Sequence, residues 1–424
     1  MNPFTHLRCR LAHICHSVAL VSNGARVKCP LLFDANAGVG PSIPGAASGM
    51  HPAARTSAGQ GTAASFAAKS GARAAKQSIF RCFRQLVFAA LPLALTGCDA
   101  ELSIFNPHGP AADRIASLSW TMTIVFLVAI VVMWLLFTYA FYRRRGSLDQ
   151  HEPVESGGGE MWIAIGGFVI PFVVLTAIFI AGLSLLSDFP IHGARAMTRS
   201  QLAQSMKPEI EVIGHQWWWE IRYLNDDPAK EFTTANELHL PVGRPVNLEL
   251  QSADVIHAFW IPALNGKIDL IPGQTNYIQL IAAQPGTYTG QCATYCGAEH
   301  SLMRILAVAQ TPAAYQAWLD NQRKPGDIPT APQAQAGEQI FVHSPCASCH
   351  TIRGTNAAGT KAPDLTHIGS RSMLASAVYP NNKAYLEAWI TNAQSLKPGC
   401  KMPNIDQFSG TQLTQLVSYL RQLQ

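Results

Sequence analysis

The sequence predicts a multidomain chain, in which a two-helix transmembrane hairpin precedes an all-β domain and a C-terminal domain that ends in a helix. Two apolar runs, at about 120–142 and 161–186, predict the hairpin because each is long enough to cross a hydrocarbon core. Short alternating segments between 207 and 319, separated by Gly- and Pro-bearing turns, predict the strands. Apolar residues at i, i+3, i+4 and i+7, from Leu413 to Leu420, predict a helix near the C-terminus.

Composition favours a membrane protein over a nucleic-acid-binding one. The chain has 424 residues, enough for two or three domains, and 48% of them are hydrophobic while only 13% are charged. Several of the positive charges behind the net charge of +5 lie in residues 1–85 and in the arginine triplet at 143–145. This distribution indicates targeting and membrane topology, and we expect no nucleic-acid partner.

Residues 1–97 have the character of a leader. Residues 1–75 are rich in Ala, Gly and Ser and lack apolar periodicity, which predicts disorder or a start codon assigned too early. A basic stretch at 76–85 and an apolar stretch at 86–95 are typical of a signal peptide. The Leu-Thr-Gly-Cys that follows resembles a bacterial lipoprotein cleavage box, so we expect a lipidated Cys98 at the mature N-terminus. An ordinary short apolar segment is the alternative.

The predicted hairpin occupies residues 98–190. Three consecutive arginines at 143–145 follow the first apolar run, and loops rich in positive charge stay on the cytoplasmic side of a membrane. Cys98 and everything after about residue 187 are therefore expected to face the periplasm. The all-β domain is predicted over 205–320.

A cluster of soft donor side chains lies near the end of the all-β domain. Cys292, Cys296, His300 and Met303 fall within one short stretch, and His257 lies upstream. Thiolate, thioether and imidazole groups suit copper. A disulfide or a zinc site is the alternative, but oxidised sulfurs could not act as thiolate ligands, and Met is a poor zinc ligand.

This stretch resembles the dinuclear copper (CuA) loop of cytochrome c oxidase subunit II, and every ligand position matches. The resemblance implies a cupredoxin Greek-key domain in which the two sulfurs bridge a copper pair. Position 294 departs from the family, which usually has Glu there to help bind magnesium at the contact with subunit I; threonine lacks that carboxylate. The implied copper ligands are the side chains of His257, Cys292, Cys296, His300 and Met303 and the backbone carbonyl of Thr294.

An aromatic cluster of the same domain begins with Gly-His-Gln-Trp at 214–217 and continues with two further tryptophans. Packing in the core is one interpretation of it. Alternation buries only one face of a strand, so three consecutive indoles leave at least one pointing outward. The motif is similar to that of the subunit II family, which implies that electrons reach the copper through Trp217.

A second metal-binding motif lies nearer the C-terminus. Cys346, Cys349 and His350 have the Cys-x-x-Cys-His spacing of c-type haem attachment, in which both thiols bind the porphyrin and the histidine binds iron. A redox-active thiol pair is the alternative. The stretch around Met402 resembles the distal loop of class I cytochromes c, which implies that Met402 is the sixth ligand of the iron.

The third domain is predicted over 336–424, after a Pro-, Gln- and Ala-rich linker at 321–335. The resemblance to class I cytochromes c implies that it is all-α. Its C-terminal apolar stripe is expected to pack on a helix at 336–342.

With three motifs in this order, the chain is identified as a member of the cytochrome c oxidase subunit II family with a fused C-terminal cytochrome c. The resemblance implies two cofactors, the copper pair and haem c, and an electron path from haem c through the copper pair to subunit I. There oxygen would be reduced to water with proton pumping, which is the activity of cytochrome-c oxidase. The implied partners are subunit I, other oxidase subunits, and a periplasmic cytochrome c or another respiratory donor.

The same resemblance implies a multi-pass protein of the bacterial inner membrane, with its copper and haem domains in the periplasm. Two other classes share single features with this chain. A copper-delivery protein would use Cys292 and Cys296 only to carry metal, and would need neither the fixed His300 and Met303 nor a haem. A subunit of a nitric oxide or nitrous oxide reductase would be distinguished by the sequence of its catalytic partner.

Overall fold

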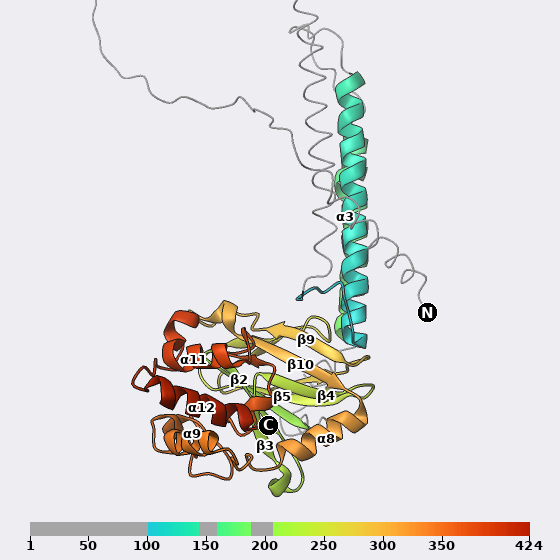
Figure 1. Ribbon diagram of the computed structural model, residues 1–424. Coiled ribbons are helices and arrows are strands. Elements are labelled where there is room, and N and C mark those ends of the chain that lie inside the picture. Colours follow the sequence, from blue (N-terminus) through green and yellow to red (C-terminus); the bar gives the residue numbers. More distant parts are fainter. Residues whose placement is uncertain (1–100, 144–158, 188–206) are drawn as a thin grey trace, which may run out of the picture. The chain divides into compact units, whose positions relative to one another are not determined.

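The computed structural model describes residues 101–143, 159–187 and 207–424 (Figure 1). The expected leader, the signal segment and Cys98 lie outside these residues, and so do Arg144 and Arg145. The described part comprises two apolar helices, a β domain and a helical C-terminal domain.

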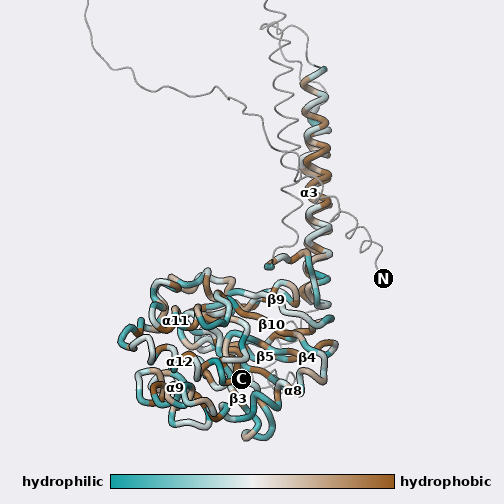
Figure 2. Tube along the Cα trace, in the orientation of Figure 1, coloured by the Kyte–Doolittle hydropathy of each residue, from teal (hydrophilic) through white to brown (hydrophobic). Residues whose placement is uncertain are grey.

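Two apolar helices confirm the predicted membrane segments. The first, α3, spans Pro110–Arg143, and hydrophobic residues predominate along its middle (Figure 2). α3 begins upstream of the apolar run that the sequence predicts. Its first residue is a proline, which is favoured at the first position of a helix, so the helix starts before the apolar residues do. The second consists of α4 at Glu160–Ala164, a π turn at Ile165–Val169 and α5 at Ile170–Ser187. Both have the length and the mean hydropathy, 2.7, of membrane-spanning helices, and α3 contacts α5.

The β domain consists of two sheets and a small hairpin. One sheet has the strand order β3-β2-β1-β5-β8 and the other β4-β10-β9, while β6 pairs with β7. The parallel pairs β1–β5 and β4–β10 lie among antiparallel neighbours, and the domain has the predicted cupredoxin-like fold. The strands are β1 Ile210–His215, β2 Trp218–Tyr223, β3 Phe232–Ala235, β4 Glu237–Pro241, β5 Val246–Ser252, β6 His257–Phe259, β7 Ile268–Leu270, β8 Asn276–Leu280, β9 Gly286–Gln291 and β10 Arg304–Gln310.

Alternation along the strands builds the core of the β domain. In β5, Val246, Leu248 and Leu250 are buried, while the residues between them are half-buried. The same core holds Trp219 and Phe259, whose rings meet edge to face at 5.9 Å. Each large buried side chain contributes about 1.5–3 kcal/mol, and the packed sheets fix the loops at the ends of their strands.

The C-terminal domain is helical and has its own core. Its first helix, α9, begins at Pro332, inside the stretch predicted as a linker, and α8 extends to Gln322, so the connection is confined to residues 323–331. A proline-rich stretch can start a helix because proline is accepted at the first helical position. The helices from this point of the chain on are α8 Pro312–Gln322, α9 Pro332–Val342, α10 Cys346–Cys349, α11 Lys383–Leu396 and α12 Gly410–Gln422.

The predicted packing of the last helix is confirmed, since α12 packs against α9 (Figure 1). Leu416, Val417 and Leu420 are buried in the core of this domain. Gly337 lets the two helices approach closely, because a Cβ there would lie 2.1 Å from the carbonyl oxygen of Gln415.

Candidate copper and haem sites

Two paired strands hold the candidate copper loop at both ends. β9 ends at Gln291, β10 begins at Arg304, and these two residues face each other in the antiparallel register. The Cys292 N–H also donates to the carbonyl of Met303 at 2.9 Å. The loop is thus closed at its base, and His257 reaches it from the start of β6.

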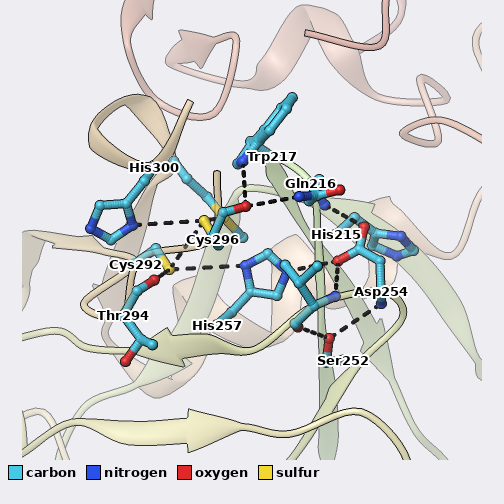
Figure 3. Close-up of polar contacts among 12 residues, drawn as sticks. His215, Gln216, Trp217, Ser252, Asp254, His257, Cys292, Thr294, Cys296 and His300 are labelled. Atoms are coloured by element: carbon cyan, nitrogen blue, oxygen red, sulfur yellow. Dashed lines mark hydrogen bonds and ion pairs between the residues drawn. The ribbon is translucent and has the colours of Figure 1, made fainter. Parts of the chain in front are cut away.

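Every implied copper donor lies next to one of the two thiol sulfurs (Figure 3). The sulfurs are 3.8 Å apart, and each faces one imidazole through its Nδ1 atom, so a small ion can touch several donors at once. The separations are 3.9 Å from Cys292 Sγ to His257 Nδ1, 3.7 Å from Cys296 Sγ to His300 Nδ1, 3.9 Å from Cys296 Sγ to Met303 Sδ, and 3.2 Å from Cys292 Sγ to the Thr294 carbonyl oxygen.

Neither a disulfide nor a zinc site fits this geometry. The sulfurs of Cys292 and Cys296 are far beyond the ~2.05 Å of a disulfide bond, and both thiols are free. The Met303 thioether is fully buried in the cluster, and zinc sites are built from Cys, His, Asp and Glu ligands and not from thioethers. The hydrogen bond between the thiols lowers the pKa of Cys292 and raises the pKa of Cys296, which favours the thiolate, the form that binds metal, at Cys292.

Asp254 fixes the orientation of the His257 imidazole. Its carboxylate accepts a hydrogen bond from His257 Nε2 at 2.8 Å, which leaves Nδ1 as the nitrogen that faces the sulfur. The same carboxylate accepts the Gln216 N–H at 2.7 Å. Burial disfavours a charge on His257, but the bonds with Cys292 and Asp254 outweigh it and raise its pKa. Partners of this kind set the tautomer and basicity of a metal-binding histidine.

Thr294 departs from the family pattern in its side chain but not in its backbone. Its carbonyl faces Cys292, as a copper ligand requires. Its hydroxyl donates to the carboxylate of Asp269 at 3.0 Å. The carboxylate next to this position therefore comes from β7 and not from residue 294.

The three consecutive tryptophans have three different environments. Trp219 is fully buried in the core. Trp218 stacks on His215, with ring centroids 4.4 Å apart. Trp217 is half-buried, and its indole N–H donates to the carbonyl of Cys296 at 3.1 Å (Figure 3). Two indoles therefore leave the core, and one of them makes a hydrogen bond to a candidate copper ligand.

A cavity of about 450 Å³ holds the candidate haem ligands. Cys346, Cys349, His350 and Met402 all line it together with mostly apolar side chains, so a flat hydrophobic group fits there. His350 donates from Nδ1 to the Pro363 carbonyl at 2.7 Å, which leaves Nε2 to face iron. Burial lowers the pKa of His350, so the imidazole stays neutral, as an iron ligand must.

Gln394 anchors the loop that carries Met402. Its side-chain amide donates to the Met402 carbonyl at 2.7 Å and to the Cys400 carbonyl at 2.6 Å. Cys400 is half-buried, and its thiol donates to the Met402 carbonyl at 3.4 Å, so it packs within the loop.

Sequence reasoning misses several of these supporting residues. Asp254 lies three residues before His257, and Gln216 directly precedes Trp217, so proximity to an expected site residue is the available signal. Gln394 carries no such signal, because the turn after α11 brings it to the Met402 loop.

Comparisons with known proteins identify the family of both domains. Residues 224–310 match the family model of the cytochrome c oxidase subunit II periplasmic domain, and residues 334–424 match that of cytochrome c. Cytochrome c oxidase subunit 2 of Alkalihalophilus pseudofirmus is 34% identical over 343 residues, which cover 80% of this chain and 96% of that protein. The Bacillus subtilis protein of the same name is 28% identical over 350 residues, which cover 80% and 96% of the two chains.

A solved structure of the periplasmic domain of cytochrome oxidase subunit II from Bradyrhizobium japonicum is 32% identical; the match covers 27% of this chain and 91% of that chain, with a TM-score of 0.25. The sequence relatives, matched over most of their length, show the family. The two family matches fall on the β domain and on the helical domain, and imply a dinuclear copper centre in the first and haem c in the second. The chain belongs to the cytochrome c oxidase subunit II family, as a member with a C-terminal cytochrome c domain.

Proposed function

We propose that this chain accepts electrons at haem c, passes them to the copper pair and delivers them to subunit I of a cytochrome-c oxidase, where oxygen reduction is coupled to proton pumping. One observation supports a direct path between the two cofactor sites. Trp217 lines the haem cavity and at the same time donates its indole N–H to the Cys296 carbonyl. When bound, haem and copper would supply one-electron redox chemistry, and the chain supplies the ligands and the contact between the two sites.

The proposed ligands are the side chains that the structure brings together. Those of the copper pair each lie within 3.9 Å of one of the two thiol sulfurs, and those of the haem line one cavity. The proposed copper ligands are His257, Cys292, Cys296, His300, Met303 and the Thr294 carbonyl, and the proposed haem ligands are Cys346, Cys349, His350 and Met402.

The β scaffold suits fast transfer because it holds the copper donors still. β9 and β10 close the ligand loop, and Gln216 and Trp217 both donate to the Cys296 carbonyl, at 2.8 and 3.1 Å. Donors fixed in this way need little reorganisation when the charge of a bound metal changes.

The proposed orientation puts both cofactor domains in the periplasm of a bacterial inner membrane, with the two apolar helices as a multi-pass anchor. Arg143 at the end of α3 supports it, because basic residues favour the cytoplasmic side. Subunit I and other oxidase subunits are the proposed partners, and a periplasmic cytochrome c or another respiratory donor would reduce the haem. Protease digestion of spheroplasts tests the orientation, and mass spectrometry of the mature N-terminus tests the lipidation of Cys98.

Trp217→Phe tests the proposed electron path. The substitution removes the indole N–H that bonds to Cys296 and keeps an aromatic ring at the wall of the haem cavity. Haem-to-copper transfer, followed by stopped-flow reduction, should slow at least about tenfold, the equivalent of about 1.4 kcal/mol in barrier height. The copper and haem contents and spectra should not change.

Trp318→Phe is the matched control. Trp318 stacks on His239 in the β domain, with ring centroids 3.9 Å apart, and lies outside the residues that line the haem cavity. Its substitution should leave the transfer rate unchanged. An unchanged transfer rate in Trp217→Phe would show that Trp217 only packs between the two sites and does not carry electrons. A single copper per haem in metal analysis would favour a copper-carrier role for the chain.

A further inference from the structure

A strained turn of the cytochrome domain lies against the β domain. Ala375, Ser376 and Ala377 have φ values of 54°, 61° and 56°. The left-handed conformation is unfavourable for a residue other than glycine. Three such residues in succession persist where the surrounding contacts hold them, and strain of this kind gathers at functional sites.

Contacts from Ser376 to the β domain hold this turn in place. Ser376 is 3% exposed, and its hydroxyl donates to the carbonyl of Trp217 at 2.7 Å. Its own carbonyl accepts the N–H of Arg304 at 3.2 Å. Arg304 directly follows Met303, so the turn contacts both the aromatic motif and the end of the copper loop.

Lys397, just after α11, reaches the same carbonyl. The side chain is 2% exposed, and its ammonium group donates to the Trp217 carbonyl at 2.8 Å and to the Ser376 hydroxyl at 3.2 Å. No carboxylate among the residues that the structure describes forms an ion pair with it, although the charge of Glu299 acts on it from a greater distance. Burial lowers the pKa of Lys397 to about 8. A buried cation without an ion pair is costly, so its position calls for a reason beyond packing.

We propose that Lys397 and Ser376 are positioning residues that clamp the main chain of Trp217 and thereby set its indole between the haem cavity and Cys296. The proposal rests on the electron path proposed above. Trp217 is held from two domains, by its carbonyl from the cytochrome domain and by its indole N–H from the β domain. The bridge is therefore complete only when the cytochrome domain is docked.

The position of the Trp217 indole matters because the proposed electron path depends on its contacts with both the haem cavity and Cys296. With its carbonyl released, the backbone of Trp217 is free to shift, and the 3.1 Å bond to Cys296 lengthens or breaks. In reactions that depend on orientation, a misplacement of about 1 Å can cost about 100-fold in rate.

Lys397→Met in the assembled oxidase tests the clamp, because methionine keeps the length of the side chain and loses the donor. Lys397 lines the haem cavity, and loss of its buried charge shifts the haem potential, so transfer rates are compared at matched driving force. Haem-to-copper transfer should then slow by up to about 100-fold, while the copper and haem contents keep their wild-type values. Hydrogen–deuterium exchange should rise in peptides that cover Trp217 and residues 375–377, a readout independent of turnover. Lys397→Arg, which keeps a cationic donor, should restore part of the rate.

Lys383→Met is the matched control. Lys383 opens the same helix, is exposed, and pairs with Glu387 at 3.7 Å. Its substitution should change neither the rate nor the exchange. Ser376→Ala is a second test if Lys397→Met lowers the yield of folded protein, because it removes one donor to the same carbonyl and leaves the cation in place. It should slow transfer and raise exchange in the same peptides.

The outcomes separate the clamp from the electron path. If Trp217→Phe slows transfer while Lys397→Met and Ser376→Ala leave rate and exchange at wild-type values, the clamp is overturned and the path stands. If Trp217→Phe leaves the rate unchanged, the path fails. Raised exchange in Lys397→Met would then reveal a docking contact without a role in transfer, which also overturns the clamp.

Discussion

The candidate copper site and the candidate haem site differ in how closely the polypeptide alone brings the ligands together. The proposed copper donors come from one loop, closed by β9 and β10, and from His257, and neighbouring donors are separated by 3.2–3.9 Å. The proposed haem ligands come from α10, from His350 directly after it and from the loop after α11, and they line a cavity of about 450 Å³. A small ion needs converging donors, which paired strands provide. A large flat group needs an apolar cavity, which helices and loops enclose.

Cys296→Ser should break the copper side alone and have the largest effect. Cys296 contacts three other donors, and a serine hydroxyl is a harder donor that suits copper poorly. We expect the copper pair to be lost. This effect is larger than the roughly 10- to 100-fold loss of copper affinity that follows removal of a residue that only hydrogen-bonds to a ligand. Haem content should stay at the wild-type level. Metal analysis with haem quantification measures the copper-to-haem ratio, and a retained copper pair would contradict the ligand assignment.

Asp254→Asn should weaken the copper side without removing a ligand. The imidazole of His257 loses the carboxylate that holds its Nε2 atom at 2.8 Å. Copper affinity should fall roughly 10- to 100-fold, as measured by competition with a copper chelator. Asp226→Asn is the control, because Asp226 is an exposed partner of Lys207. Equal affinities in the two variants would show that the carboxylate of Asp254 does not support the ligand.

Gly337→Ala should act on the haem side alone. The added Cβ would lie 2.1 Å from the Gln415 carbonyl, so α9 and α12 must move apart, at a cost of about 1–3 kcal/mol in the stability of the cytochrome domain. Thermal unfolding followed by circular dichroism of the haem band measures this loss, and the copper spectrum should be unaffected at temperatures below the transition. Gly410→Ala is the control, since a Cβ there meets nothing within 4 Å. Equal unfolding temperatures would show that α9 and α12 have room to adjust.

Glu237→Gln should have the smallest effect on stability, and only at pH values at which the Glu237 carboxyl group is ionised in the wild-type protein. Burial alone would raise the pKa of Glu237, but the nearby imidazole of His239 and the hydrogen bonds from Ser372 outweigh it and hold the pKa below 4.5. The carboxylate therefore stabilises the folded chain fully at pH above 4.5, and this contribution is lost as the pH falls through the lowered pKa. The variant should be less stable by about 1 kcal/mol at neutral pH.

The difference between wild type and Glu237→Gln should shrink on acidification below pH 4.5. Thermal unfolding of the two proteins at pH values on both sides of 4.5 measures it. A difference that does not vary with pH would show that the charge of Glu237 plays no part in holding Ser372 of the cytochrome domain.

The sequence predicts a helix or strand best where the environment is the same along its whole length. The apolar runs predict α3 and α5 because lipid demands apolar residues along the whole span, whereas the start of α3 at Pro110 lies in a polar stretch without that demand. Alternation predicts β1 and β5. The linker at 321–335 is predicted too long, because proline indicates a loop unless its place at the start of a helix is considered.

Site residues are predictable where they are neighbours in the chain. Cys292 and Met303 belong to one loop, so their spacing alone indicates a shared site. Lys397 meets the Trp217 carbonyl across 180 residues, and no spacing rule reaches so far. Contacts between domains depend on how two folded surfaces fit, which no local pattern in a single sequence records.

The short connection between α8 and α9 makes the meeting of the two cofactor domains an intramolecular event. Residues 323–331 tether the domains, and a short tether maintains an effective concentration on the order of millimolar. A freely diffusing carrier would reduce the copper domain at a rate set by its own abundance, whereas the tethered domain is always at hand. Under the proposed order of electron transfer, dilution of the enzyme or scarcity of soluble carriers would leave the haem-to-copper step at full speed and limit only the reduction of the haem.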